Sequence, residues 1–154
     1  MTYYLLALCI GVVAGLRAVT APAAASWAAW LGWLSLRGTP LAFLGYSAAP
    51  WILTVLAIGE LIADQLPKTP SRKVPVQFGT RLITGALSGA AVGAGGGVLI
   101  GGLVAGVVGA VVGTLGGAAA RARLAAAFGR DLPAALLEDV VAIGAAVLIV
   151  FAVR

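Results

Sequence analysis

The chain has 154 residues, of which 62% are hydrophobic and only 10% are charged. Its mean hydropathy is +1.09, and an ordinary soluble domain carries about 25% charged residues. So few polar groups cannot cover the surface of a soluble domain. The composition therefore excludes a soluble enzyme, a disordered chain and a coiled coil, and predicts one all-α polytopic membrane domain over residues 1–154 with the lipid bilayer as its partner.

Residue usage also limits the chemistry. The sequence has no histidine and a single cysteine, Cys9, which rules out a disulfide within the chain and a Cys/His metal site. The net charge of +5 comes from basic residues in short loops, which favours orientation in an anionic membrane over nucleic-acid binding. We expect no cofactor and no enzymatic activity, since the usual acid–base side chain is missing.

The first apolar stretch is interrupted early. Residues 3–36 as one helix would be about 50 Å long, much more than a hydrocarbon core of about 30 Å. Pro22 follows Arg17 and Thr20 closely, and proline breaks helix continuity. We expect a break near 17–22 and two short helices, although a single broken crossing stays open as an alternative.

The rest of the chain alternates between apolar segments and polar connectors. Prolines in 67–75 argue against a regular helix there, and Gly95–Gly97 marks a break between two glycine-rich helices. Arginines at 121–130 mark a further connector, and Pro133 suits a first helical turn. The sequence thus predicts about six helical segments, over 3–16, 18–36, 51–66, 80–94, 98–119 and 134–153.

The distribution of basic residues predicts the topology. When loops 67–81 and 121–130 are placed in the cytoplasm, Arg17 lies on the same side, and only Arg37 and Arg154 lie outside. Both termini are then outside. A weak similarity between residues 55–59 and 140–144 suggests a 3+3 inverted repeat, with halves 1–66 and 80–154 joined by the basic loop 67–79. Chance recurrence of apolar residues is an equal alternative.

Glycines recur every four residues, so each set falls on one helical stripe where another backbone can approach closely. We expect glycine-zipper helix packing within one subunit; a homo-oligomeric seam or a backbone-lined pore are alternatives. The stripe glycines are Gly85, Gly89, Gly93, Gly97, Gly101, Gly109, Gly113 and Gly117.

The acidic residues are few and most of them fall in apolar helices. Carboxylates in hydrocarbon cost roughly 2.5–3.5 kcal/mol each on insertion scales, so they face a bundle interior or a hydrated cavity and have partners. Two interpretations are about equally favoured: a polar ion- or substrate-binding chamber, and a set of structural salt bridges of Arg17, Lys68 and Arg81 with Glu60, Asp64 and Asp139. The chamber residues would be Glu60, Asp64, Glu138, Asp139 and Arg17, with Glu60 and Asp64 as the ligands of any metal ion.

The stretch after the third segment combines basic and hydroxyl groups. Such groups can bind a lipid phosphate or a phosphate-bearing solute, although an anchor on the cytoplasmic side is the simpler interpretation. The residues concerned are Lys68, Thr69, Ser71 and Arg72.

At these motifs the sequence resembles the bacterial membrane-protein family known as domain of unknown function 4126. The resemblance spans the whole chain. It implies a compact integral protein of the bacterial cytoplasmic membrane and supplies no substrate. The residues that carry it are Gly15–Arg17, Thr20–Pro22, Ser26–Trp27, Gly59–Asp64, Leu66–Arg72, Asp131–Pro133 and Leu137–Asp139.

From the residues, the leading functional hypothesis is a small membrane transporter or channel whose intramembrane carboxylates take a cation or a proton-coupled small solute. The alternatives are a non-transporting scaffold or oligomer built on the glycine stripe, and a protein that handles lipid phosphate.

Overall fold

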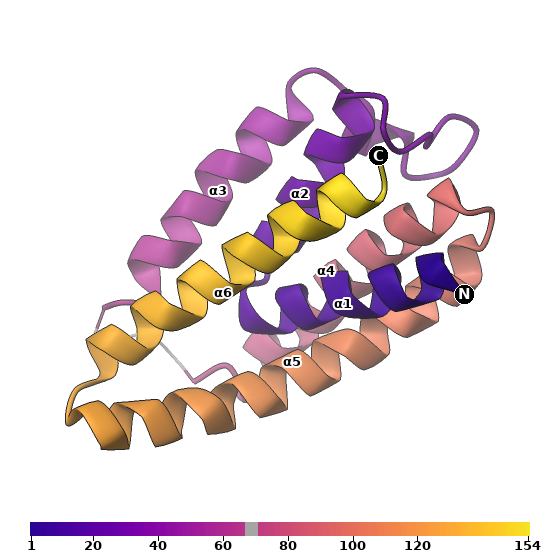
Figure 1. Ribbon diagram of the computed structural model, residues 1–154. Helices are drawn as coiled ribbons and strands as arrows, with labels where there is room; N and C mark the ends of the chain where they lie inside the picture. The colour runs from indigo at the N-terminus through magenta and orange to yellow at the C-terminus, as the bar shows by residue number, and fades with distance from the viewer. Residues whose placement is uncertain (67–70) are drawn as a thin grey trace.

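The structure is a computed structural model that describes residues 1–66 and 71–154, and within these ranges it contains only helices (Figure 1). The helices are α1 (Thr2–Leu16), α2 (Thr20–Trp30), the short 3-10 helix η1 (Ala42–Gly45), α3 (Ala49–Ala63), α4 (Pro75–Gly95), α5 (Leu99–Phe128) and α6 (Asp131–Ala152). The prediction of an all-α chain with six main segments is confirmed.

The six α-helices alternate in direction between two ends of the molecule (Figure 1). At one end, here called the charged end, α1, α3 and α5 finish and α2, α4 and α6 begin. The two chain termini lie near each other toward the opposite end. Residues 3–36 therefore run to the charged end and back as two helices. The break falls at Arg17, whose backbone is extended (φ −139°, ψ 111°).

Glycines let α1, α4 and α5 pack with their backbones in contact. A Cβ atom added to Gly11 of α1 would lie 2.8 Å from the Cα of Gly106 in α5. One added to Gly89 of α4 would lie 2.6 Å from the same Cα atom. Only a residue without a side chain allows approaches this close. We call α1, α4 and α5 together the scaffold.

The predicted stripe glycines do not all share this role. Gly85, Gly89 and Gly93 pack on α5, and Gly109 and Gly113 pack on α1. Gly97 instead lies in the turn after α4 with φ +70°, a backbone conformation that favours glycine. Gly101 lies against the ring of Tyr4, and Gly117 lies near Leu16, Arg72 and Glu138.

Two helices are longer than expected. α5 continues to Phe128 instead of ending near 119, because residues 118–128 are mostly Ala, Arg and Leu, which are strong helix formers. It ends where Gly129 takes the left-handed conformation (φ +68°). α4 begins at Pro75, since proline is well suited to a first helical position.

α2 is shorter than expected and ends at Trp30. The connector that follows is packed rather than loose, with Leu36 and Leu44 buried against the bundle. The buried Ser26 hydroxyl donates a hydrogen bond of 2.5 Å to the Leu44 carbonyl oxygen. This bond fixes η1 against α2.

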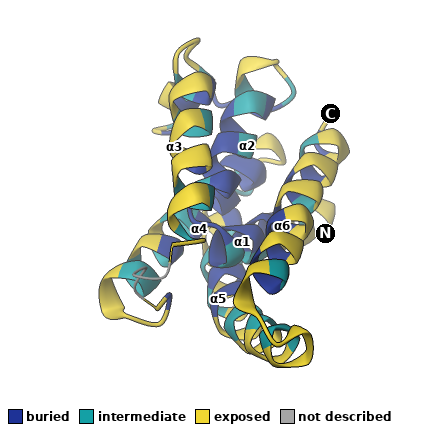
Figure 2. Ribbon diagram, turned by 90° about the vertical axis from the view of Figure 1, so that its left-hand side faces the viewer, coloured by how far each residue is buried: buried dark blue, intermediate teal, exposed yellow. Residues whose placement is uncertain are grey.

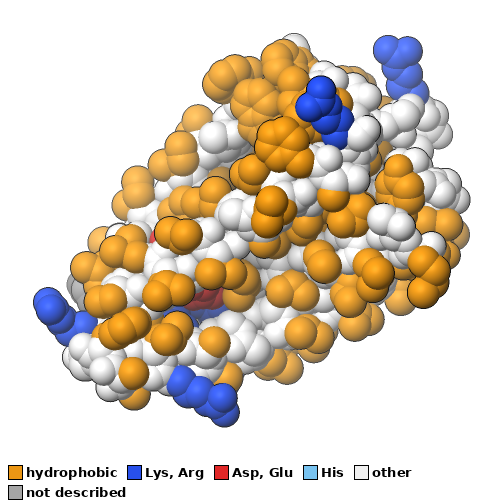
Figure 3. All heavy atoms as spheres, viewed as in Figure 1, with side chains coloured by type: hydrophobic (Ala, Val, Ile, Leu, Met, Phe, Trp, Pro, Cys, Tyr) orange, Lys and Arg blue, Asp and Glu red, His pale blue; other side chains and the backbone are white. Residues whose placement is uncertain are grey.

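The exterior between the two ends is apolar. Hydrophobic side chains cover most of the face in Figure 3, and basic side chains project at its two ends. Ile100, Leu148 and Val140 are more than two-thirds exposed. α5 and α6 are each long and apolar enough to span a membrane.

Candidate functional site: an arginine–carboxylate network at the charged end

The acidic and basic side chains at the charged end come from different parts of the fold. Asp64 follows α3, and Asp131, Glu138 and Asp139 lie on α6. Their arginine partners belong to the scaffold or to the segment that leads into it: Arg17 directly after α1, Arg72 shortly before α4, and Arg121 on α5. The network therefore joins two acid-bearing helices, α3 and α6, to a cationic scaffold.

Arg17 lies at the centre of the network. Its side chain is fully buried, and it forms ion pairs with Asp64 and Asp139. Its Nε atom donates to the Asp139 carboxylate at 2.6 Å, and a terminal nitrogen lies 3.9 Å from Glu138. Because an isolated buried charge costs several kcal/mol in a protein interior, this arginine depends on the carboxylates for its burial.

Arg121 and Arg72 complete the network. Arg121 lies 3.1 Å from the Asp64 carboxylate, 2.7 Å from that of Asp131 and 3.6 Å from that of Glu138. Arg72 holds Glu138 with both terminal nitrogens, one of them at 2.8 Å. Such two-point pairs fix geometry as well as charge. Asp64 and Glu138 are thus each shared by more than one arginine.

Glu60 has a different role, at the break between α1 and α2. Its two carboxylate oxygens accept hydrogen bonds from the backbone amides of Ala18 and Val19, at 2.7 and 2.8 Å. These amides precede the first residue of α2, where an anion interacts favourably with the helix dipole. Glu60 therefore caps α2 from the neighbouring helix α3.

Arg81 stabilises the other side of the same break. It is almost completely buried, and it donates to the carbonyl oxygens of Gly15 and Leu16 at 3.0 and 2.8 Å. These carbonyls end α1 and have no partner within the helix, so a cation there is favourable. A cation from α4 and an anion from α3 together hold the chain reversal.

Gly117 makes room for the ion pair between Arg72 and Glu138. A Cβ atom at this position would lie 3.0 Å from a terminal nitrogen of Arg72 and 3.3 Å from a carboxylate oxygen of Glu138. A larger residue would press on both partners. The glycine stripe on α5 thus serves helix packing at Gly109 and Gly113 and the ionic network at Gly117.

The five predicted chamber residues do come together at the charged end, but they meet arginines and backbone amides. Arg17, Asp64, Glu138 and Asp139 belong to one ion-pair network, and Glu60 lies beside it on α3. Among the described residues, no three acidic, cysteine or histidine side chains are arranged to hold a metal ion.

The predicted phosphate-binding residues have separate outcomes. Lys68 and Thr69 lie outside the described residues. Arg72 is buried and paired with Glu138. Ser71 is exposed, and its hydroxyl accepts a hydrogen bond from the Lys73 amide at 3.3 Å.

Sequence reasoning did not include Arg121 and Asp131 in the site, and it expected Arg81 to pair with the acids, whereas Arg81 donates to backbone carbonyl oxygens. Asp131 and Arg121 are ten residues apart across a helix end, and the acid lies at the start of α6. The extent of α5 was the missing information. With residues 120–128 assigned to a connector, Arg121 had no fixed place from which to reach Asp64.

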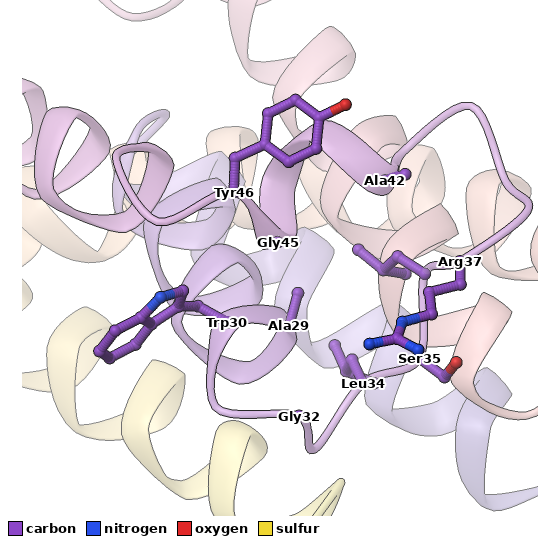
Figure 4. A pocket seen from close by; sticks show the side chains of 10 residues that line it. Ala29, Trp30, Gly32, Leu34, Ser35, Arg37, Ala42, Gly45 and Tyr46 are labelled. Carbon is purple, nitrogen blue, oxygen red and sulfur yellow. The ribbon is translucent and has the colours of Figure 1, made fainter.

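Two hollows lie away from the network. One, of about 480 Å³, is formed at the opposite end by the connector after α2; Arg37, Ser35 and Tyr46 lie around it (Figure 4). The other, of about 410 Å³, lies between α2, α3 and α6 and is lined almost entirely by apolar side chains. We call the second hollow the lateral groove.

Searches of protein-family models, of curated proteins and of solved structures found no match for this chain.

Proposed function

We propose that the chain is a small transporter of the cytoplasmic membrane in which the arginine–carboxylate network is a gate at the cytoplasmic end. The observation that carries the proposal is the division of charge between parts of the fold. Arg17 directly follows α1 of the scaffold and Arg121 lies on its helix α5, whereas Asp64 directly follows α3 and Glu138 lies on α6. Opening the gate would separate the arginines from the carboxylates.

The scaffold and the acid-bearing helices differ in how they are held. Backbone contacts through Gly11, Gly89 and Gly106 join α1, α4 and α5, and packed backbones of this kind do not deform gradually. α3 in contrast contributes only Ala57 and Pro50 as buried residues. α3 is therefore the helix with least packing to lose when it moves.

Two carboxylates of the network are each shared by more than one arginine, so their ion pairs can exchange. Asp64 lies between Arg17 and Arg121, and Glu138 lies near Arg17, Arg72 and Arg121. A proton taken up by one carboxylate removes its charge, and the arginine then keeps the other partner. Because the carboxylates are already occupied by guanidinium groups, a metal cation would have to displace an arginine to reach them, so the proposal is a proton-coupled solute and not direct coordination of a metal cation.

The membrane placement and the repeat belong to the same proposal. An apolar exterior with basic residues at both ends suits a bilayer, and the larger basic set would lie in the cytoplasm. An inverted repeat would pair α2 with α5. These helices have 11 and 30 residues, so the two halves could share the order of their helices but not the helix lengths. The resemblance to domain of unknown function 4126 stays a prediction.

The glycines give less support to the alternative of a non-transporting membrane protein that assembles into an oligomer. Gly85, Gly89 and Gly93 are used against α5 within one chain, so the stripe is not left free for a second copy. The lipid-phosphate alternative is weakened because Arg72 is committed to Glu138.

The test is proton movement in reconstituted vesicles. Purified protein is inserted in liposomes that contain a pH-sensitive dye, and an inward proton gradient is imposed with sodium, potassium or magnesium salts as separate arms. We expect protein-dependent proton uptake in wild type. Asp64→Asn should reduce the rate at least tenfold, because it removes the carboxylate shared by two arginines.

Asp131→Asn is the matched control. It also removes one carboxylate of the network, but its side chain is 62% exposed and lies at the edge. It should keep most of the flux. Full activity in Asp64→Asn, or no flux in wild type in any salt, would contradict the proposal.

A further inference from the structure

The lateral groove contains one buried polar group that has no partner among the described residues. Thr20 lines the groove at the start of α2 and is only 8% exposed. Its hydroxyl oxygen makes no hydrogen bond with the described part of the chain. A buried hydroxyl without a partner is costly, by roughly 1–3 kcal/mol, so a ligand that offers Thr20 a hydrogen bond would gain affinity from it.

The walls of the groove define the rest of the occupant. α3 and α6 stand apart on either side of α2 (Figure 2), and the lining includes Ala23, Ala57 and Ala146 from these three helices. These alanines leave space along α2, and the other lining side chains are mostly larger apolar ones. Among the described residues, no charged side chain lines the groove.

The direction of the groove follows from α2. Thr20 is at the charged end, and Trp27, Trp33 and Phe151 lie farther along toward the opposite end. The 11 residues of α2 cover about 16 Å at 1.5 Å per residue. A volume of about 410 Å³ is at the small end of ligand sites, which span roughly 300–1,000 Å³. It suits one hydrocarbon chain rather than two.

We propose that the lateral groove binds a single-chain, uncharged amphiphile, with its hydroxyl or ester head hydrogen-bonded to Thr20 and its acyl chain lying between α2 and α6. An uncharged head is expected because the described groove lining offers no charged partner. An anionic head is further disfavoured by Glu60, whose carboxylate is bonded to the amide of Val19, next to Thr20 in the chain. The site does not depend on the transport proposal, because it uses none of the ion pairs.

The groove contains its own optical reporters. Trp27 and Trp33 line it, and Trp30 and Trp51 do not. In a Trp30→Phe, Trp51→Phe background, the fluorescence comes from the two groove tryptophans. The probe is a monoacylglycerol whose acyl chain carries two bromine atoms, which quench tryptophan on contact. We expect saturable quenching in detergent solution.

Variants of the polar contact test the head group. Thr20→Val keeps the shape and removes the hydroxyl, and it should weaken binding about three- to tenfold, the effect of one hydrogen bond. Thr20→Ser should stay within about twofold of wild type. Thr80→Val, at an exposed threonine of α4, is the matched control and should change nothing.

A filling variant tests the chain-binding part. Ala146→Phe places a ring in the groove and should abolish saturable quenching, whereas Ala122→Phe on the exposed side of α5 should not. Native mass spectrometry of the otherwise unaltered chain, with and without Thr20→Val, gives the same comparison without tryptophan replacements.

Several results would overturn the proposal. These are quenching that rises linearly with probe, equal binding by wild type and Thr20→Val, or equal binding of the brominated fatty acid anion. If Ala146→Phe instead converts a dimer to a monomer, the groove is covered by a second copy of the chain and the lipid assignment is wrong.

Discussion

Gly11 of α1 and Gly106 of α5 meet backbone to backbone, so that a Cβ atom on Gly11 would lie 2.8 Å from the Gly106 Cα. Both partners at this contact are backbone atoms, so no side chain can move aside. A Cβ atom on Gly11 could be accommodated only if the two helices separated. The close contact between α1 and α5 therefore depends on the absence of a side chain at these two residues.

Gly11→Ala should destabilise the protein by about 1–3 kcal/mol, the usual cost of overpacking, or more if the helices cannot separate. Gly144→Ala on α6 is the matched control, since a Cβ atom there meets nothing within 4 Å. It should be neutral or slightly stabilising, because alanine is a better helix former. Thermal unfolding in detergent measures both, and equal melting temperatures would contradict the assignment.

Arg17→Met should cost about 3–5 kcal/mol, because it removes one partner from a buried ion pair and leaves the carboxylates of Asp64 and Asp139 with too little positive charge. Adding Asp139→Asn should recover part of this loss. Arg123→Gln, at an exposed position of α5, should change stability by no more than about 0.5 kcal/mol. Denaturant or thermal unfolding of the four proteins forms the test. A double variant less stable than Arg17→Met would argue against the pairing.

Glu60→Gln should loosen the turn between α1 and α2 locally. The amide side chain has one oxygen where the carboxylate has two, so one of the Ala18 and Val19 amides loses its acceptor. A lost cap costs about 0.5–2 kcal/mol. Hydrogen exchange should become faster at residues 18–20 and stay unchanged in α5. Asp131→Asn, which also removes one negative charge, should leave exchange at 18–20 as in wild type.

Ser26→Ala should release η1 from α2. The Leu44 carbonyl oxygen loses its 2.5 Å hydrogen bond while remaining buried, which costs about 1–3 kcal/mol. Proteolysis or hydrogen exchange of residues 36–46 should increase. Ser47→Ala, at an exposed serine in the same connector, should have no effect, and the same response from both variants would show that Ser26 is unimportant.

The helices and their order could be predicted because each is set by local sequence. Apolar runs, Pro22 and the Gly95–Gly97 break are visible in the chain, and so is the scarcity of acids that brought Glu60, Asp64, Glu138 and Asp139 into one group. Which partner each of these acids meets depends on distances between helices, and the sequence alone does not give those distances. Nothing local distinguishes Glu60, which caps a helix, from Asp64, which pairs with two arginines.

The glycine register was predicted only in part for a similar reason. Spacing by four along α4 identified Gly85, Gly89 and Gly93, but the surfaces they meet are Gly102 and Gly106 of α5, which fall outside the predicted stripe. Which glycines face each other depends on the offset between the two helices. That offset is fixed by the turn after Gly95, and the spacing within one helix carries no information about it.

The length of α5 has a consequence for how deep the protein would sit in a bilayer. Its 30 residues extend about 45 Å at 1.5 Å per residue, against a hydrocarbon core of about 30 Å. Tilting or protrusion must take up the difference, and the final turns with exposed Arg123 would reach the lipid phosphates. Bilayer thickness would then act on the ionic network, because Arg121 lies on the segment that a thinner or thicker membrane would displace.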